Sequence, residues 1–485
     1  LHLSGDGIGA DLMASRAPIF SNWSKIATAW LPFADAASTE LPLGRLLRLS
    51  LFQISVGMTM VLLNGTLNRV IIVELGVPAW LVSLMIALPL LFAPLRALIG
   101  HRSDHHKSVL GWRRVPYIWM GTLVQFGGLA LMPFALLLMS RPDVAGIGTV
   151  AALVAFLMTG AGLHTAQTAG LALATDLAPE DSRPRAVALL YVMLLAGMVA
   201  TAFTIGDLLR DFTPTRMIQV IQGVGLLTAV FNFVALWKQE PRRRLSAEER
   251  AAPPPPFRAV WREFIADATA RRLLVAVGLG AAAFSMQDIL LEPYGGEILG
   301  MSVGGTTELT GLWAMGNLIG FTYAARVLGD GANPHRIAGM GGVVGVFAFA
   351  MVMLAAPLDA SGLLYLGACA IGLGAGLFLV GTLTAAMALA RDGRSGIALG
   401  AWGAVQATAT GLAIAAGGIA RDTIGASATA GRLGAALADR ATGYAAVYGF
   451  EILLLLFTLA VLGPLAGRSR ESAAGAPFGL SQFPT

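Results

Sequence analysis

The chain alternates between long apolar runs and shorter polar segments, and this alternation predicts its fold. An α-helix needs roughly 20 mostly apolar residues to cross a bilayer, and we count about twelve runs of that kind. They lie near residues 48–69, 78–99, 115–139, 147–175, 186–209, 215–237, 273–293, 305–328, 337–357, 361–390, 396–420 and 443–466. The pattern predicts an all-α polytopic membrane protein with twelve transmembrane helices.

One long polar connection, 238–272, divides the twelve runs into six and six. It holds three consecutive arginines, Arg242 to Arg244, and four prolines, Pro253 to Pro256, a composition typical of a semi-rigid linker. The predicted domains are a cytoplasmic N-terminal segment (1–47), a six-helix bundle (48–237), the cytoplasmic linker (238–272), a second six-helix bundle (273–466) and a cytoplasmic tail (467–485).

The first forty residues lack the basic and apolar regions of a cleavable signal peptide. Within them, Trp23, Ile26, Ala27, Trp30 and Leu31 recur at helical spacing. This favours a short amphipathic helix at 22–33 that lies in the membrane interface, with its Trp side chains at headgroup level. The alternative is a tail with scattered tryptophans.

Composition and charge agree with a membrane protein. Apolar residues make up 56% of the chain and charged residues 13%, with a mean hydropathy of +0.71, whereas about a quarter of a soluble domain is charged. Most of the 33 Lys and Arg residues fall in alternate loops, on the side that holds both termini. The positive-inside rule therefore predicts cytoplasmic termini, so the net charge of +5 has a topological use and does not indicate nucleic acid.

Motifs of soluble enzymes are missing from the sequence. There is no Gly-x-Ser-x-Gly elbow, no phosphate loop and no His-Glu-x-x-His pair. The lone Cys369 lies within a predicted span, which excludes an internal disulfide. We therefore expect a protein that is not an enzyme, and we look for its site among polar residues inside the spans, where each one is costly.

His164 is the one histidine inside a predicted span, in GLHTAQTAG, and Gln167 follows three residues later near the same helix face. A neutral imidazole can serve as the single axial ligand of a metal such as the magnesium of a chlorophyll. The alternative is a histidine bonded to a neighbouring helix that serves packing.

The seventh span ends with two carboxylates on one helix face, Asp288 and Glu292. A proton-coupled transporter needs groups of this kind. The alternative, which we favour slightly, places Glu292 and Glu297 in water at the outer mouth, because Pro293 and the pair Gly295–Gly296 predict a helix break there.

The first span ends with Asn64, Asn68 and Arg69, and Glu74 lies just beyond it. Interhelical hydrogen bonding is the plain account of the two asparagines. Arg69 and Glu74 are candidates for an ion pair on the outer side.

Several spans are rich in glycine. Close helix approach explains these residues without a ligand, although a flat macrocycle could also lie against such a helix. The glycines are Gly341, Gly345, Gly372, Gly374, Gly376, Gly400 and Gly403.

The polar loop GHRSDHHKSVLGWRR (100–114) resembles the signature between the second and third helices of the major facilitator superfamily. Gly100, Asp104, Arg113 and Arg114 match that motif, with extra residues between Asp104 and the Arg pair. Asp104 suits a helix N-terminus, while the arginines suit acidic partners or lipid headgroups. The motif indicates the fold and does not identify a substrate.

Three longer runs, 48–82, 88–137 and 286–302, resemble the PucC/LhaA family of bacteriochlorophyll-delivery proteins. The resemblance implies a twelve-helix facilitator fold in two six-helix halves that escorts bacteriochlorophyll to light-harvesting apoproteins. The runs WSKIATAWLPFADA and GGIARDTIGASATAGRLGAALADRATGYAAVYGFE look closer to the LhaA branch, which implies the core antenna LH1 as the client.

The resemblance also implies a set of ligands and partners. The cofactor is bacteriochlorophyll, with a carotenoid as a further option, and the partners are light-harvesting apoproteins, the reaction centre–LH1 complex and the lipid bilayer. Bacteriochlorophyll synthase and the membrane insertion machinery are further candidates, and no nucleic acid is expected. The location is the bacterial inner, intracytoplasmic photosynthetic membrane.

With that cofactor, His164 becomes the favoured axial ligand of the pigment magnesium, and Gln167 the second pigment-binding residue. Further candidates for cofactor contacts are Asn64, Gln125, Gln287 and Glu292. Two other functions stay open from the residues themselves, a proton-coupled small-molecule transporter and a catalyst of pigment modification.

Overall fold

The computed structural model describes residues 41–91, 112, 114–179, 183–240, 265–389 and 395–468. The predicted interfacial helix at 22–33 and the motif residues Gly100, Asp104 and Arg113 lie outside these ranges. Within them the chain is helical and has no β-strand.

The N-terminal half contains six spans, of which the first is built from three consecutive helical segments. Its elements are α2 (Leu43–Met60) with the π-helical η3 (Val61–Leu67) and η4 (Val70–Glu74), α3 (Ala79–Leu91), α5 (Val115–Met139), α6 (Ala145–Leu177), α7 (Arg183–Leu208) and α8 (Pro214–Leu236).

The C-terminal half repeats this plan, and its first span is also segmented. Its elements are α10 (Ala268–Ser285) with the 3-10 helix η6 (Met286–Ile289) and α11 (Leu291–Glu297), α12 (Val303–Gly329), α13 (Pro334–Ala355), α14 (Ser361–Ala388), α15 (Ser395–Thr429), the short η7 (Ala435–Leu437) and α16 (Ala441–Arg468).

These helices correspond one by one to the twelve predicted spans, so the prediction is confirmed. Within the described ranges, ten helices are long and apolar enough to cross a membrane. The other two are α12, which has 27 residues but is less apolar, and α3, whose apolar part covers Ala79–Leu90.

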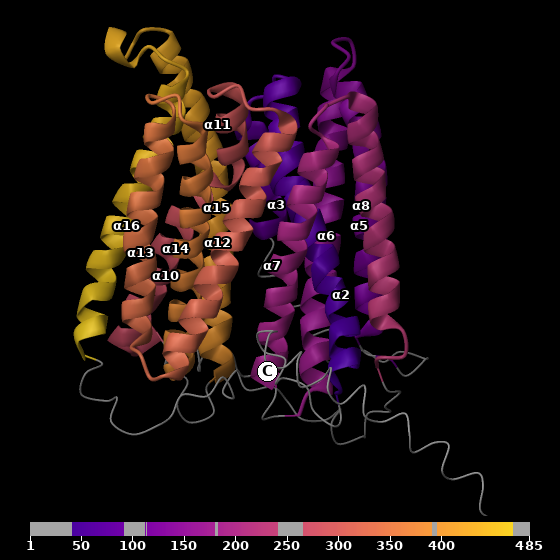
Figure 1. Cartoon of the computed structure of the whole chain (residues 1–485), viewed down its shortest axis with the longest axis vertical. Helices are drawn as coiled ribbons and strands as arrows, with labels where there is room; N and C mark the ends of the chain where they lie inside the picture. Colours follow the sequence, from indigo (N-terminus) through magenta and orange to yellow (C-terminus); the bar gives the residue numbers. More distant parts are fainter. Residues whose placement is uncertain are drawn as a thin grey trace, which may run out of the picture.

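Both halves run between the same two ends of the bundle (Figure 1). We call the end where α8 stops and α10 begins the linker end, and the opposite one the far end. At the linker end, Arg45 near the start of α2 donates from Nε to Gln239 Oε1 at 2.9 Å. Arg272 near the start of α10 donates to the Val461 carbonyl of α16 at 2.8 Å. The first span therefore begins, and the last span ends, at the linker end.

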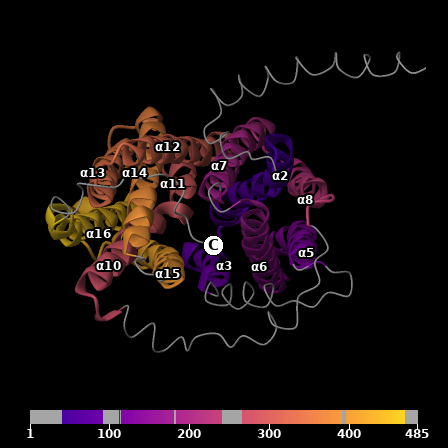
Figure 2. The ribbon, with the colours of Figure 1, turned by 90° about the horizontal axis from the view of Figure 1, so that it is seen from below.

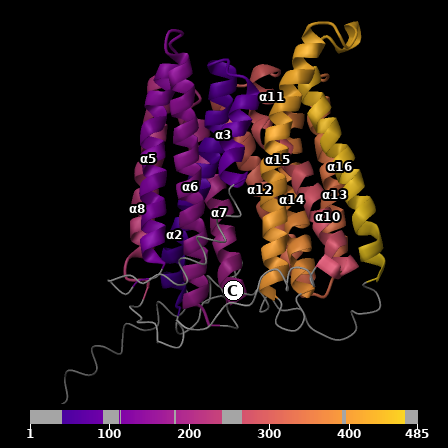
Figure 3. The same cartoon turned by 180° about the vertical axis from the view of Figure 1, so that it is seen from behind.

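The two halves meet along two helix pairs. In the view from below, the N-terminal and C-terminal helices form separate groups (Figure 2), and α7 packs on α12 between them. On the opposite side α3 packs on α15 (Figure 3). These contacts leave the first and seventh spans, α2–η3–η4 and α10–η6–α11, facing each other at the centre.

Most of the glycines noted in the sequence serve close packing. A Cβ at Gly372 would lie 1.9 Å from the Trp313 carbonyl, and one at Gly341 would lie 2.5 Å from the Gly374 carbonyl. Such distances leave no room for a side chain, so the packing interpretation holds at these positions. Gly400 and Gly403 differ, because a Cβ there would meet nothing within 4 Å.

Candidate functional site

The two central spans are both irregular where they face each other. The first span changes from α2 to the π-helical η3 at Val61, and π-helical turns are rare and frequently mark functional sites. The seventh span breaks at η6, before α11 begins at Leu291. The predicted break at Pro293 and Gly295–Gly296 is therefore wrong in place, because those residues lie inside α11.

Polar contacts join the halves around this irregular region. Asn68 Nδ2 donates to the Ile289 carbonyl at 2.8 Å, which confirms the predicted interhelical role of this asparagine. Thr66 and Thr307 hydroxyls lie 3.1 Å apart. These bonds hold η3 against η6 and α12, towards the far end.

The far end is held further by ion pairs. Arg69 pairs with Glu74, as the sequence predicted, and Arg421 of α15 pairs with Glu297 of α11. Tyr444 also donates to Glu297 at 2.6 Å. The Glu297 carboxylate is thus partly exposed but bonded to Arg421 and Tyr444, whereas the sequence pattern had predicted a carboxylate in water.

Glu292 is buried, with 3% of its surface exposed. The interpretation that placed it in water at the outer mouth is therefore wrong. Its Oε1 accepts from the Thr310 hydroxyl of α12 at 2.5 Å, and its Oε2 has no hydrogen-bond partner among the described residues. The turn of α11 beyond the helix break directs this carboxylate inward, which spacing alone did not reveal.

Three cavities lie between the halves, with volumes of about 280, 110 and 80 Å³, and Asp288 and Met60 border all three. The smallest is also lined by Asn64, Gln287 and Glu292. The structure therefore brings together three of the four residues that we selected for cofactor contacts, beside Asp288.

Hydrogen bonds order the seventh span around these cavities. Gln287 Nε2 donates to Asp288 Oδ1 at 2.5 Å, and the Gln287 backbone N–H donates to Glu451 Oε1 of α16 at 2.7 Å. Glu451 is fully buried and escaped the sequence analysis, although a lone carboxylate in an apolar run was a usable signal.

The cavity of about 110 Å³ is lined by His164 of α6 together with Asn64 and Asp288. The histidine thus faces the interface between the halves. Gln167, three residues further along α6, is half-buried and does not line this cavity.

Gln125 lies elsewhere, inside the N-terminal half. Its Nε2 donates to the Thr59 hydroxyl of α2 at 2.6 Å, so it joins α5 to α2. One helix further, Asn232 of α8 accepts from Ser55 at 2.6 Å and donates to Thr122 at 2.8 Å. Gln125 therefore belongs to a buried polar ladder, whose other members sequence reasoning missed.

Arg114, the described member of the loop motif, holds acidic partners as predicted. Its Nε donates to Asp176 Oδ2 of α6 at 3.0 Å. The backbone N–H groups of Arg114 and Val115 donate to the Glu240 carboxylate at 3.1 and 2.9 Å. An anion at the N-terminus of α5 is favourable. Together these contacts join the start of α5 to the ends of α6 and α8.

A pocket of about 900 Å³ lies at the linker end between α5 and α8. We call it the aromatic pocket because Trp112, Trp119, Phe233 and Trp237 line it. The Phe233 ring lies 5.2 Å from that of Trp237 and 6.3 Å from that of Trp119. About half of the Phe233 and Trp237 surfaces is exposed. Four polar residues at the linker end complete the lining: Arg45, Lys238, Gln239 and Glu240.

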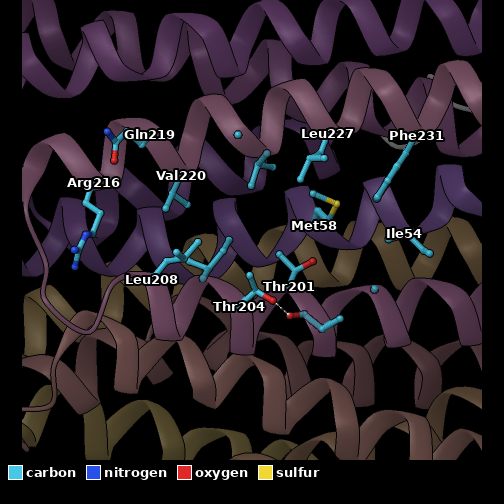
Figure 4. A pocket seen from close by; sticks show the side chains of 15 residues that line it. Ile54, Met58, Thr201, Thr204, Leu208, Arg216, Gln219, Val220, Leu227 and Phe231 are labelled. Carbon is cyan, nitrogen blue, oxygen red and sulfur yellow. Dashed lines mark hydrogen bonds between the residues drawn. The ribbon is translucent and has the colours of Figure 1, made fainter.

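A second apolar groove, of about 410 Å³, runs between α7 and α8 with α2 as its floor. Figure 4 shows Met58 and Ile54 beneath it, Leu227 along it and Arg216 at one end. The Thr204 hydroxyl donates to the Ala200 carbonyl of its own helix at 2.7 Å, which leaves the wall apolar. Neither lateral site was predicted, because each combines residues from two or more helices.

Solved structures define the class of this fold. A bacterial homologue of the human lysosomal transporter Spinster, in an inward-facing and unoccupied conformation, aligns with a TM-score of 0.67 and 15% identity. The alignment covers 90% of this chain and 98% of that one. A mutant of the nucleoside transporter NupG aligns with a TM-score of 0.62 and 13% identity, over 86% and 99% of the two chains. The chain has the major facilitator fold.

Sequence comparison narrows the class. The model of the PUCC protein family matches residues 66–470, and the chain belongs to this family. Protein PucC of Rhodovulum sulfidophilum is 55% identical over 83% of this chain and 90% of its own length. An "Uncharacterized protein in puhA-bchM intergenic region" of Rhodobacter capsulatus is 54% identical over 95% and 98%. The "Bacteriochlorophyll synthase 44.5 kDa chain" of Rhodobacter capsulatus is 30% identical over 85% and 93%.

Proposed function

We propose that this protein is an assembly factor for light-harvesting complexes, which binds bacteriochlorophyll in the membrane and delivers it to antenna apoproteins. Membership of the PucC family supports the assembly role. The relative that is 30% identical, the Bacteriochlorophyll synthase 44.5 kDa chain, points to the same pigment. The proposed location is the bacterial photosynthetic membrane.

The size and the position of the pockets are the observation that supports pigment binding. Sites for organic ligands commonly measure about 300–1,000 Å³. The aromatic pocket, at about 900 Å³, lies in this range, and its half-exposed Phe233 and Trp237 rings would make it reachable from the side in a bilayer. The cavities between the halves, at about 280 Å³ or less, lie below it. A carrier that takes up its ligand from the bilayer needs a pocket that can be reached from the side, such as the aromatic pocket.

His164 remains the proposed axial ligand, with Gln167 beside it. A histidine can donate one ring N–H to a partner and bind a metal with the other nitrogen. The cavity of about 110 Å³ at His164 is too small for a macrocycle, so ring binding there requires α3 and α15 to separate. Asn64, Gln287 and Glu292 would then border the opened space.

We further propose LH1 as the client and the LhaA branch as the subgroup. The two N- and C-terminal runs that resemble LhaA support this assignment. Overall identity does not decide between the LhaA and PucC branches. Two relatives with different names, Protein PucC and the protein of the puhA–bchM region, are 55% and 54% identical to this chain.

The test is purification of the full chain in mild detergent from a phototroph, followed by an absorption spectrum and by antenna spectra of a deletion strain. We expect bacteriochlorophyll bands with the protein and a loss of LH1 in the deletion strain. Colourless protein together with intact antenna complexes would overturn the proposal. Loss of LH2 alone would overturn only the LH1 assignment.

A second candidate function is proton-coupled transport of a small molecule. Asp288 favours it, because this half-buried carboxylate borders every cavity described between the halves. Uptake into proteoliposomes driven by a pH gradient, and lost in Asp288→Asn, would establish this function. Protein that carries no pigment and shows no uptake in this assay would count against both candidate functions.

A further inference from the structure

We propose that the broken seventh span and the π-helical first span build a binding site for a monovalent cation, Na⁺. The site is the cavity of about 80 Å³ between the halves, lined by Asn64, Gln287, Asp288, Glu292 and Thr310. This inference does not depend on pigment binding and adds a ligand to the centre of the molecule.

Two buried side chains at this cavity have unused acceptor atoms. Glu292 and Gln287 are 3% and 2% exposed. Glu292 Oε2 and Gln287 Oε1 have no hydrogen-bond partner among the described residues. Buried polar atoms nearly always have a partner, so each exception needs an explanation such as an ion or water. An ionised carboxylate without a cation is the costlier of the two.

Helix geometry at the cavity favours a positive charge. The span α10 ends at Ser285, and η6 carries Asp288 directly beyond that end. The C-terminus of a helix carries partial negative charge on its free carbonyl groups. Arg69 adds positive charge near Glu292. It makes its ion pair with Glu74 and a hydrogen bond with the Met301 carbonyl, so Glu292 Oε2 has no bonded cation among the described residues.

The donor atoms and the volume select the type of cation. All candidate ligands are oxygens, which hard cations prefer. Asp288 Oδ1 and Glu292 Oε1 already accept hydrogen bonds, so each of the five side chains offers at most one free oxygen. That is fewer than the six to eight oxygens that Ca²⁺ takes, and Mg²⁺ retains several waters. A cavity of about 80 Å³ is small for Mg²⁺ together with its retained waters. Asp288 also borders the larger cavities and is only half-buried, so Glu292 is the charge that needs neutralising.

The site joins the two halves. Asn64, Met60 and Met198 come from the N-terminal half, and the other lining residues come from the C-terminal half. Bound Na⁺ therefore stabilises the arrangement in which η3 lies against η6. Asp288 borders both the cavity of about 280 Å³ and the site.

The experiment is thermal unfolding of the purified full chain in detergent, with NaCl against choline chloride at constant pH and ionic strength. A ligand that binds only the folded state raises the melting temperature in a saturable way, and we expect this for Na⁺. Glu292→Gln should abolish the shift. Asn64→Ala keeps both carboxylates but loses one ligand. It should raise the Na⁺ concentration that gives half of the maximal shift by about tenfold.

Glu308→Gln is the matched control, because Glu308 is a partly exposed carboxylate on α12 that pairs with Arg210 outside the cavity. It should keep the full shift. Equal melting temperatures in Na⁺ and choline, a dependence on pH but not on Na⁺, or an unchanged shift in both Glu292→Gln and Asn64→Ala would each overturn the proposal. Pigment content measured on the same samples keeps this result separate from the delivery function.

Discussion

Gly65 of η3 lies directly against the carboxylate of Glu292. A Cβ at position 65 would be 2.3 Å from Glu292 Oε1 and 2.8 Å from the Thr310 hydroxyl. The contact crosses from one half of the molecule to the other, so the close approach of the two halves here depends on the absence of a side chain at this position.

Gly65→Ala should therefore destabilise the protein. Overpacking of a tight interior costs about 1–3 kcal/mol, and here it displaces a buried carboxylate from its hydroxyl donor. The measurement is the melting temperature of the purified protein, which we expect to fall by several degrees. Gly223→Ala in α8 is the control, because a Cβ there meets nothing within 4 Å and alanine favours a helix over glycine by about 1 kcal/mol. Equal effects of both changes would contradict the packing argument.

The ion pair between Arg114 and Asp176 should contribute measurably to stability. Arg114 is buried, with a side chain 8% exposed, while the Asp176 side chain is 34% exposed, so the pair is screened more than a fully buried one. We expect Arg114→Gln and Asp176→Asn each to cost about 1–2 kcal/mol, below the 3–5 kcal/mol of a fully buried pair. A double-mutant cycle should give a positive coupling, and strict additivity would show that the two side chains act independently.

His164→Ala should lower the pigment that copurifies with the protein. Loss of an axial ligand should reduce affinity at least as much as the roughly tenfold loss typical of outer-shell partners. His335→Ala in α13 is the control, since this histidine lies in the other half and away from the cavity at His164. The measurement is the ratio of bacteriochlorophyll absorbance to protein. An unchanged ratio in His164→Ala would remove this residue as the ligand and leave the carrier function standing.

Replacing Phe233 or Trp237 by Ala should also reduce copurified pigment, because both rings form the wall of the aromatic pocket. Aromatic pairs add about 0.5–1.5 kcal/mol beyond their buried area, so a loss of several-fold is expected. Phe347→Ala is matched to Phe233→Ala, since Phe347 is a lipid-facing phenylalanine, 67% exposed, on α13. If all three variants kept the pigment of the parent, the pocket would not be its binding site.

The sequence by itself determined the twelve spans, the two halves and the far-end pair of Arg69 and Glu74. Runs of about 20 apolar residues have few alternatives to a membrane helix, because the backbone must satisfy its own hydrogen bonds in lipid. Asn68 and Arg114 were also interpreted correctly, because a polar group next to or inside a span must find a partner.

Only the tertiary structure decided which of these residues meet. The position of the helix break at η6, rather than at Pro293, turns Glu292 inward, and no periodicity predicts such a turn. The convergence of Asn64, Asp288 and His164 on shared cavities requires three spans that are far apart in the sequence. The aromatic pocket likewise needs α5 beside α8. Local pattern dictates which segments form helices, but contacts between helices depend on how complementary surfaces pack across long chain separations.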